Sequence, residues 1–290
     1  MKTQRALIAA LALLTTILAC VVPGLPASQP APAASPLGTA DTRLEIMVAE
    51  TVSAALEQTQ QAVPTFTLEP TSTSTPRPTI TPSPTPDVDD SGSSIDRFED
   101  NTSKFTDSRA GYEITLLKGW LPVRINEQEY LDAWLLPELS DPAMQRSLGS
   151  IGSQSPDELR LFVIDIQEGH TEIDFVTNIN LYWDQKNEMS LDNDEDLKAE
   201  AAALSKALPG LEVLTSELSV TTSEVPIGII TSKTPVTTLD GVAVELSQKQ
   251  VFINTNVGVL IITLSTTEEL KQTVLPQFDS MIETFKITNP

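Results

Sequence analysis

The distribution of proline divides this chain into a segment that cannot form a packed core and a segment that can. Twelve of the 21 prolines lie between Pro23 and Pro86, and the other nine are spread over everything that follows. Proline fixes φ and lacks a backbone N–H, so a dense run of it interrupts both helices and sheets. We therefore expect one globular domain over residues 105–290, a length typical of a single domain.

The chain begins with the features of a secretory signal. Lys2 and Arg5 form a basic start, residues 6–19 form an uncharged apolar run, and small residues precede the cleavage point. The run is too short for an ordinary bilayer-spanning helix, which needs about 20 apolar residues. The sequence thus predicts a signal peptide over residues 1–19 and an extracytoplasmic mature protein.

Cys20, the only cysteine of the chain, directly follows Ile17, Leu18 and Ala19. This pattern resembles a bacterial lipobox, and the resemblance implies that Cys20 becomes the mature N-terminus and carries a diacylglycerol thioether, with acylation of its freed amine. Two or more acyl chains such as palmitate, at about 0.8 kcal/mol per buried methylene, hold a protein stably at a membrane surface. We expect a lipid anchor on the extracytoplasmic face of the cell membrane. The alternative is that Cys20 is an ordinary residue of the apolar run, with cleavage elsewhere or none.

Two spacers of different character follow Cys20. Residues 20–40 are rich in Pro, Ala and Ser and predict a flexible tether. Residues 41–63 predict an amphipathic helix, because apolar residues recur every four positions. The stripe consists of Leu44, Val48, Val52 and Leu56. Such a helix either associates with itself or a partner, or is a marginal helix within a low-complexity spacer, and the pattern leaves both open.

Residues 64–104 predict a disordered linker. Its first part, residues 64–86, repeats Thr and Pro and favours polyproline II, which at about 3.1 Å per residue reaches roughly 70 Å. Clustered hydroxyls beside proline also resemble O-glycosylated stalks, with a bare linker as the equal alternative. Its second part, residues 87–104, is acidic and rich in Ser and Gly.

The negative charge of the chain excludes anionic partners. The sequence contains 18 basic and 40 acidic residues, which gives a formal net charge of −22. Binding to nucleic acid or to an anionic membrane face requires clustered Lys and Arg. We therefore expect neither. Because the folded part has no cysteine, its stability must come from its core and not from disulfides.

Hydrophobic periodicity predicts a mixture of strands and helices within the domain. Strands are expected at 111–120 and 121–125, paired as an opening hairpin, and at 159–166, 211–220, 227–233, 242–253 and 257–264. Helices are expected at 172–186, from the acids at 192–196 to Pro209, and in a terminal segment with Thr266 or Thr267 as N-cap and a kink at Pro276.

The two ends of the domain carry motifs of a known family. These are Phe105, Gly111-Tyr112-Glu113-Ile114, Lys118-Gly119-Trp120, a closing strand at 257–264 and a helix ending at 282–287. With the strand-loop-helix centre, they resemble the PsbP-like fold, which includes the PsbP proteins of photosystem II and DcrB-type bacterial lipoproteins. The resemblance implies an α+β domain whose mostly antiparallel sheet is flanked by helices as an α/β/α sandwich. The chain departs from the pattern at Leu117, where proline is frequent, and in an acidic insert around Asp192. No functional motif of the family maps onto it.

The chain lacks the residue combinations of most enzymes. It has one histidine, His170, and after lipidation no free thiol, whereas nucleophilic catalysis needs a base beside the nucleophile. His170 follows Gly169, and we interpret it as a solvated loop residue. Zinc sites with Cys and His ligands are excluded by count, and no cofactor motif is present. We expect neither an enzyme nor a cofactor, although carboxylates are numerous enough for an all-acid site.

One run of acids could bind a cation. Asp192, Asp194 and Asp196 alternate along the sequence and could offer oxygen ligands to calcium. An EF-hand loop would also need Gly and Glu where this chain has Leu197 and Ala203. The alternative is that the acids are favoured by the N-terminal dipole of the helix that begins there.

Four aromatic residues could either line a pocket or anchor the core. They are Trp120, Trp134, Tyr182 and Trp183. In a domain with few aromatics we interpret them as core residues.

These features favour a non-enzymatic lipoprotein that presents its domain on a stalk, for binding a protein partner or stabilising an envelope complex. The alternatives are a receptor for a small ligand or cation, a carboxylate-based enzyme, and a structural element whose stalk is the working part. The sequence gives no partner and no oligomeric state.

Overall fold

The computed structural model describes residues 92–170, 175–238 and 241–288. The signal peptide, Cys20, the tether, the helix expected at 41–63 and most of the expected linker lie outside the described residues. None of the helices in these three ranges is long and apolar enough to cross a bilayer.

The larger of two sheets has seven strands, and each is antiparallel to its neighbours. Their order is β4-β5-β6-β10-β9-β8-β7. The strands are β4 Trp120–Val123, β5 Leu159–Asp165, β6 Asn178–Asp184, β7 Glu212–Val220, β8 Pro226–Thr237, β9 Ala243–Asn254 and β10 Val259–Thr267. Strands β7 to β10 follow one another as a meander, and β10 then pairs with β6 to join the meander to the earlier strands.

The smaller sheet also consists of antiparallel pairs. Its strands, in the order β1-β2-β3-β11, are β1 Ser93–Arg97, β2 Ser103–Asp107, β3 Tyr112–Leu116 and β11 Lys286–Ile287. The residues that form β1 were expected to belong to a disordered linker over 64–104, and that expectation is wrong at its C-terminal end. Ile95 pairs with Phe105 and packs against the core, so a strand with little apolar character is held by its pairing with β2.

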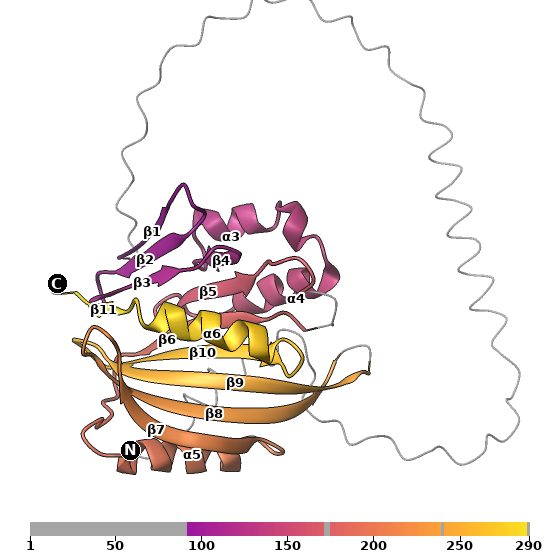
Figure 1. Cartoon of the computed structure of the whole chain (residues 1–290). Helices are drawn as coiled ribbons and strands as arrows, with labels where there is room; N and C mark the ends of the chain where they lie inside the picture. Colours follow the sequence, from indigo (N-terminus) through magenta and orange to yellow (C-terminus); the bar gives the residue numbers. More distant parts are fainter. Residues whose placement is uncertain (1–91, 171–174, 239–240, 289–290) are drawn as a thin grey trace, which may run out of the picture. The chain divides into compact units, whose positions relative to one another are not determined.

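Two apolar clusters lie on opposite faces of the larger sheet. One contains α4 (Pro142–Ile151), α5 (Glu195–Ala207) and one residue of α3 (Gln128–Ala133). The other contains the smaller sheet and α6 (Lys271–Ile282), which lies along the sheet in Figure 1. Strand β10 contributes Ile261 to the first cluster and Leu260 to the second. The α+β class, with mostly antiparallel strands flanked by helices, is therefore confirmed.

The strands β5, β7, β8, β9 and β10 and the helix α5 agree with the elements expected from periodicity, within a few residues at their ends. By contrast, periodicity predicted no element over residues 126–158. The structure has α3, a 3-10 turn at Pro137–Leu139 and α4 there. A local signal was present, because Asp141 caps α4 by accepting from the N–H of Ala143 at 2.7 Å and Pro142 occupies the first helical position.

The helix expected at 172–186 is wrong, because β6 occupies residues 178–184 and every residue of that strand is buried. Ile179 and Trp183 are four positions apart, which suits one face of a helix. With Leu181 between them they also suit one face of a strand. Pairing with β5 on one side and β10 on the other decides in favour of the strand.

Two further expectations need correction. Residues 111–125 do not form a hairpin, because β3 belongs to the smaller sheet and β4 to the larger one. The turn between them includes Gly119 at φ +86, a conformation that favours glycine. The N-cap of α6 is Leu270 and not Thr266 or Thr267, because β10 continues through both threonines.

Candidate functional site

The helix α3 carries the most prominent apolar surface that we find in the described part of the chain. Leu131, Trp134 and Leu135 are 57 %, 37 % and 82 % exposed, and we call these three residues the α3 patch. They follow helical spacing, so one side of α3 and its C-terminal end faces solvent while Ala133 is fully buried. Large apolar side chains gathered within five positions are typical of a protein-binding surface.

Several contacts hold α3 in place. The hydroxyl of Tyr130 donates to the carbonyl oxygen of Leu148 on α4 at 3.1 Å. The ring of Tyr130 also packs edge-on against Trp134, with ring centroids 6.1 Å apart. A guanidinium nitrogen of Arg124 lies 2.6 Å from a carboxylate oxygen of Glu129. The α3 patch is thus attached to a fixed support and needs no rearrangement to be presented.

The charged residues next to the α3 patch in the sequence are acidic. Glu127 lies at the N-cap position of α3, Asp132 lies within the helix, and Glu138 lies in the following 3-10 turn. Asp132 and Glu138 are exposed. A complementary surface would therefore combine apolar residues at its centre with basic residues at its rim.

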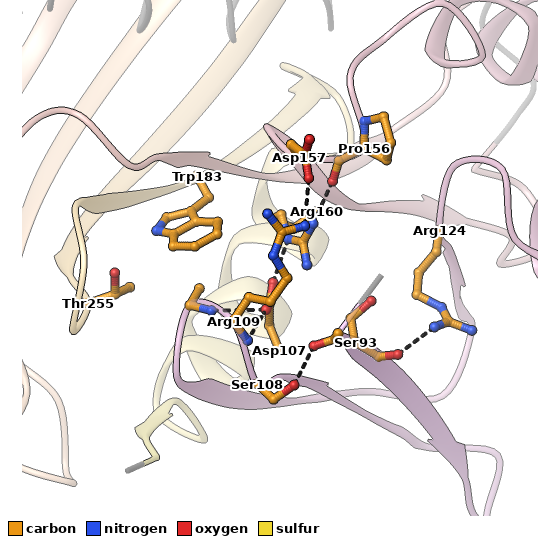
Figure 2. A network of polar contacts seen from close by, with 12 residues as sticks. Ser93, Asp107, Ser108, Arg109, Arg124, Pro156, Asp157, Arg160, Trp183 and Thr255 are labelled. Carbon is orange, nitrogen blue, oxygen red and sulfur yellow. Dashed lines mark hydrogen bonds and ion pairs between the residues drawn. The ribbon is translucent and has the colours of Figure 1, made fainter. Parts of the chain in front are cut away.

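A buried ion pair connects the two sheets (Figure 2). Nε of Arg160 on β5 donates to Oδ2 of Asp107, the last residue of β2, at 2.6 Å, and another guanidinium nitrogen donates to the carbonyl oxygen of Pro156 at 2.6 Å. The other carboxylate oxygen of Asp107 accepts from the backbone N–H groups of Arg109 and Ala110, both at 3.0 Å. Both charges are therefore paired and hydrogen-bonded, as buried charges must be.

Two arginines lie beside one indole in the same region. The guanidinium carbons of Arg109 and Arg160 are 5.9 Å and 5.7 Å from the ring centroid of Trp183, within the range of a cation–π contact. Arg109 also pairs with Asp157 at 2.5 Å, and this hydrogen bond lowers the pKa of the Asp157 carboxyl. Since both guanidinium groups have carboxylate partners, we interpret this network as a structural joint between the sheets.

His170 was expected to be a solvated loop residue, and this expectation is wrong. It lies in the turn after β5, but its side chain is only 13 % exposed and its Nδ1 lies 2.5 Å from Oδ2 of the fully buried Asp165. The other oxygen of Asp165 accepts from the backbone and side-chain amides of Gln167 at 3.0 Å. Gln167 in turn bonds Gln277, which also accepts from Nε1 of Trp120. Within the described ranges, the hydrogen-bond partner of His170 is this carboxylate and not a nucleophile.

The three aspartates proposed as cation ligands do not converge. Asp194 pairs with Lys198 at 2.5 Å, and Oδ2 of Asp196 accepts from the N–H of Ser190 at 3.0 Å. Asp192 is exposed, and it lines a surface cleft of ≈ 970 Å³ together with Asp196. In the part of the chain that the structure describes, no group of three or more His, Cys, Asp or Glu residues could hold a metal ion. The acids lie at the start of α5, where the helix dipole favours them.

Three of the four aromatic residues are core anchors as expected. Trp120, Tyr182 and Trp183 are at most 4 % exposed. The hydroxyl of Tyr182 donates to Glu158 at 2.6 Å, and burial together with this bond raises its pKa. Trp134 is the exception, because it belongs to the exposed α3 patch.

Sequence reasoning missed the α3 patch although a signal for it exists. Leu131, Trp134 and Leu135 stand at positions i, i+3 and i+4, a spacing typical of one helical face. The pairing of Arg160 with Asp107 had no local signal, since the two residues are 53 positions apart.

Comparisons with known proteins place this chain beside several solved structures of low sequence identity. No protein-family model and no curated protein matches the chain. Cyanobacterial PsbP (CyanoP) from Synechocystis sp. PCC 6803 is 18 % identical over 64 % of this chain and 92 % of its own, with a TM-score of 0.37. LpqN, involved in cell envelope biogenesis of Mycobacterium tuberculosis, is 12 % identical over 68 % and 91 %, with a TM-score of 0.37. The Ran-binding protein Mog1p of Saccharomyces cerevisiae is 11 % identical over 66 % and 97 %, with a TM-score of 0.36.

Proposed function

We propose that this chain is a non-enzymatic, lipid-anchored protein of the extracytoplasmic membrane surface, which binds a protein partner through the α3 patch. The observation that carries the binding role is the exposure of Leu131 on α3 and of Trp134 and Leu135 directly after it, on a segment that is itself held in place. Exposure of leucine and tryptophan side chains to water is unfavourable, and their burial against a partner surface would be favourable.

The anchor is supported by the N-terminal sequence. Cys20 is the only cysteine and stands directly after Ile17, Leu18 and Ala19, where lipid attachment requires it. The Thr-Pro run at 64–86 then separates the membrane from the domain. A tethered domain gains from such a spacer, because it can reach partners away from the lipid surface.

The absence of catalysis is supported by how the titratable groups are used. His170 is engaged by Asp165, and Arg160 by Asp107. A catalytic base needs a nucleophile or substrate atom within hydrogen-bond reach. In the described ranges no hydroxyl group is hydrogen-bonded to His170.

The anchor is tested by metabolic labelling with a palmitate analogue in producing cells. Wild type should be labelled and should partition with membranes, whereas Cys20→Ser should be unlabelled. Equal labelling of the two forms would contradict lipid attachment at Cys20.

The partner surface is tested by site-specific photo-crosslinking in intact cells. A photoreactive residue is placed at Leu135 in the α3 patch or, as a matched control, at Leu214, an exposed leucine on β7. A discrete protein adduct should form from position 135 and not from position 214, and Leu131→Glu should abolish it. Adducts of equal yield from both positions would show nonspecific proximity and refute the assignment.

A further inference from the structure

Strand β7 forms one edge of the larger sheet. It ends the strand order, and β8 is its one neighbouring strand in the part of the chain that the structure describes. Figure 1 shows β7 as the outermost strand of the meander. None of its nine residues is buried, and Val220 is 58 % exposed. An exposed edge strand presents unpaired backbone groups with which another strand can pair.

The other sheet edges in the described ranges carry features that hinder such pairing. Strand β4 has four residues and contains Pro122, which lacks a backbone N–H. Strand β11 has two residues. At β1, the carbonyl oxygen of Ser93 already accepts from the guanidinium group of Arg124 at 2.6 Å. Strand β7 is longer than these three strands and contains no proline, so it is the edge that is best suited to pairing.

The pairing of β7 with β8 determines which backbone groups of β7 face outward. The N–H of Thr221 donates to the carbonyl oxygen of Val225 at 3.0 Å, so these two residues form a hydrogen-bonded pair. Along an antiparallel ladder, such pairs alternate with pairs whose N–H and C=O groups point away from each other. Counted back from Thr221, the residues whose backbone groups face outward are Ser216, Leu218 and Val220.

We propose that β7 pairs with β7 of a second copy of this chain, in an antiparallel register centred on Leu218. In this register Leu218 lies opposite Leu218 of the second copy, and Ser216 lies opposite Val220 of the second copy. Each of these pairs exchanges two hydrogen bonds, so the two chains are joined by about six. The β-bulge between Val213 and Thr215 lies outside the paired segment and does not interrupt it.

The side chains of β7 are self-complementary in this register. Leu218 packs partly against the apolar cluster that includes α4 and α5, and Val220 lies on the same side of the strand. Pairing places the two Leu218 side chains next to each other, with Val220 of each copy on the diagonal. Glu217 is the one charged residue of segment 216–220 and lies opposite Ser219 of the second copy, so like charges are not directly opposed. This match favours a second copy over an unrelated strand.

The size of the paired segment predicts a weak dimer. Five residues at about 3.4 Å each give a length of about 17 Å. Stable interfaces usually bury at least about 1,200 Å², which is more than one short strand pair provides. The net charge of −22 also opposes self-association, and salt screens this repulsion. We therefore expect a dimer that forms at high protein concentration and high ionic strength.

Cysteine crosslinking tests the register in the full chain with Cys20→Ser, which removes the native thiol. Ser216→Cys and Val220→Cys are introduced into separate chains, and disulfides are allowed to form with oxidised glutathione. Residues of a hydrogen-bonded pair have Cα atoms about 5.5 Å apart, which a disulfide can bridge. In either chain alone, the two thiols would lie about 14 Å apart. The mixture of both chains should therefore form disulfide-linked dimers at least about tenfold faster than either chain alone.

Sedimentation of the Cys20→Ser chain measures dimerisation directly, at concentrations up to about 1 mM. Val220→Pro removes an outward N–H and leaves the bonds between β7 and β8 intact, so it should raise the Kd about tenfold or more. Val220→Thr keeps this N–H and the shape of the side chain, and as the matched control it should dimerise like the parent chain.

Three results would each overturn the proposal. They are a monomer at every concentration, equal crosslinking of the mixed and the separate cysteine chains, and equal dimerisation of Val220→Pro and Val220→Thr. Because segment 216–220 and the α3 patch share no residue, failure here leaves the proposed partner surface unaffected. A crosslinked adduct between two copies has twice the mass of the chain, which distinguishes it from an adduct with another protein.

Discussion

Nε of Arg160 lies 2.6 Å from Oδ2 of Asp107, and this pair joins a strand of the larger sheet to a strand of the smaller one. The side chains are 2 % and 0 % exposed. Each charge is tolerated in this environment only because the other is present, since an unpaired buried charge is strongly unfavourable. The packing of the smaller sheet on the larger one therefore depends on both residues.

Replacing Arg160 with methionine should destabilise the domain by about 3–5 kcal/mol, because Asp107 would remain buried without its partner. Urea unfolding followed by circular dichroism measures this free energy. Arg109→Met is the matched control, since Arg109 also contacts Trp183 but its ion pair with Asp157 is exposed. We expect a cost of about 0–1 kcal/mol for the control. Equal losses for the two variants would contradict the role assigned to the buried pair.

A buried tyrosine should make stability fall at alkaline pH. Burial, and secondarily the charge of Asp107, raise the pKa of Tyr112 well above 10.0. The folded state thus holds this proton more tightly than the unfolded state does. The resulting stabilisation is complete below pH 10.0 and is lost as the pH rises through the raised pKa of the folded state.

Tyr112→Phe should therefore flatten the decline of Tm above pH 10.0, the ordinary pKa of tyrosine. At neutral pH the substitution should not lower the free energy of unfolding, because the Tyr112 hydroxyl has no hydrogen-bond partner among the described residues. Tyr182→Phe is the comparison, since it removes a bond to Glu158 and should cost about 1 kcal/mol at neutral pH. A Tm profile of Tyr112→Phe that parallels the wild type up to high pH would refute the assignment.

The turn between β9 and β10 requires glycine at position 258. Gly258 has φ +81, and an added Cβ would collide with the backbone of Asp184 and Gln185. Gly169 has the same φ, but nothing lies within 4 Å of its Cβ position. Gly169→Ala should lower the free energy of unfolding only by the backbone strain of about 1 kcal/mol. Gly258→Ala should lower it clearly more, because the collision adds to that strain. Urea unfolding of both variants measures the difference, and similar losses would show that the collision relaxes at no cost.

The elements that the sequence predicted correctly are those whose local pattern fits only one type of secondary structure. Helix α5 has Leu197, Ala201 and Leu204 on one face and ends before Pro209-Gly210, so periodicity and termination agree. The apolar run of β10 fits a strand buried on both faces. For β6 the local pattern fitted two structures, and only pairing with distant strands decided between them.

Features that depend on tertiary contacts could not be predicted in this way. Strand β1 has the sequence Ser-Ser-Ile-Asp-Arg, which carries no strand signal, and it exists because β2 supplies hydrogen bonds. The burial of His170 follows from the turn geometry that brings it to Asp165. The alignment of Asn180, Thr263 and Gln250 across β6, β10 and β9 became recognisable only from the strand register.

The exposure of the α3 patch predicts that it can be altered without loss of stability. Leu131→Glu and Leu135→Glu should change the free energy of unfolding by no more than about 0.5 kcal/mol, because both side chains already face solvent. Ala133→Glu, between them, should unfold the region because Ala133 is fully buried. Partner capture in cells should be lost in both leucine variants, because binding would bury the new carboxylate against the apolar centre of the partner surface. Retained capture by stable, folded Leu131→Glu and Leu135→Glu would show that the partner binds elsewhere on the domain.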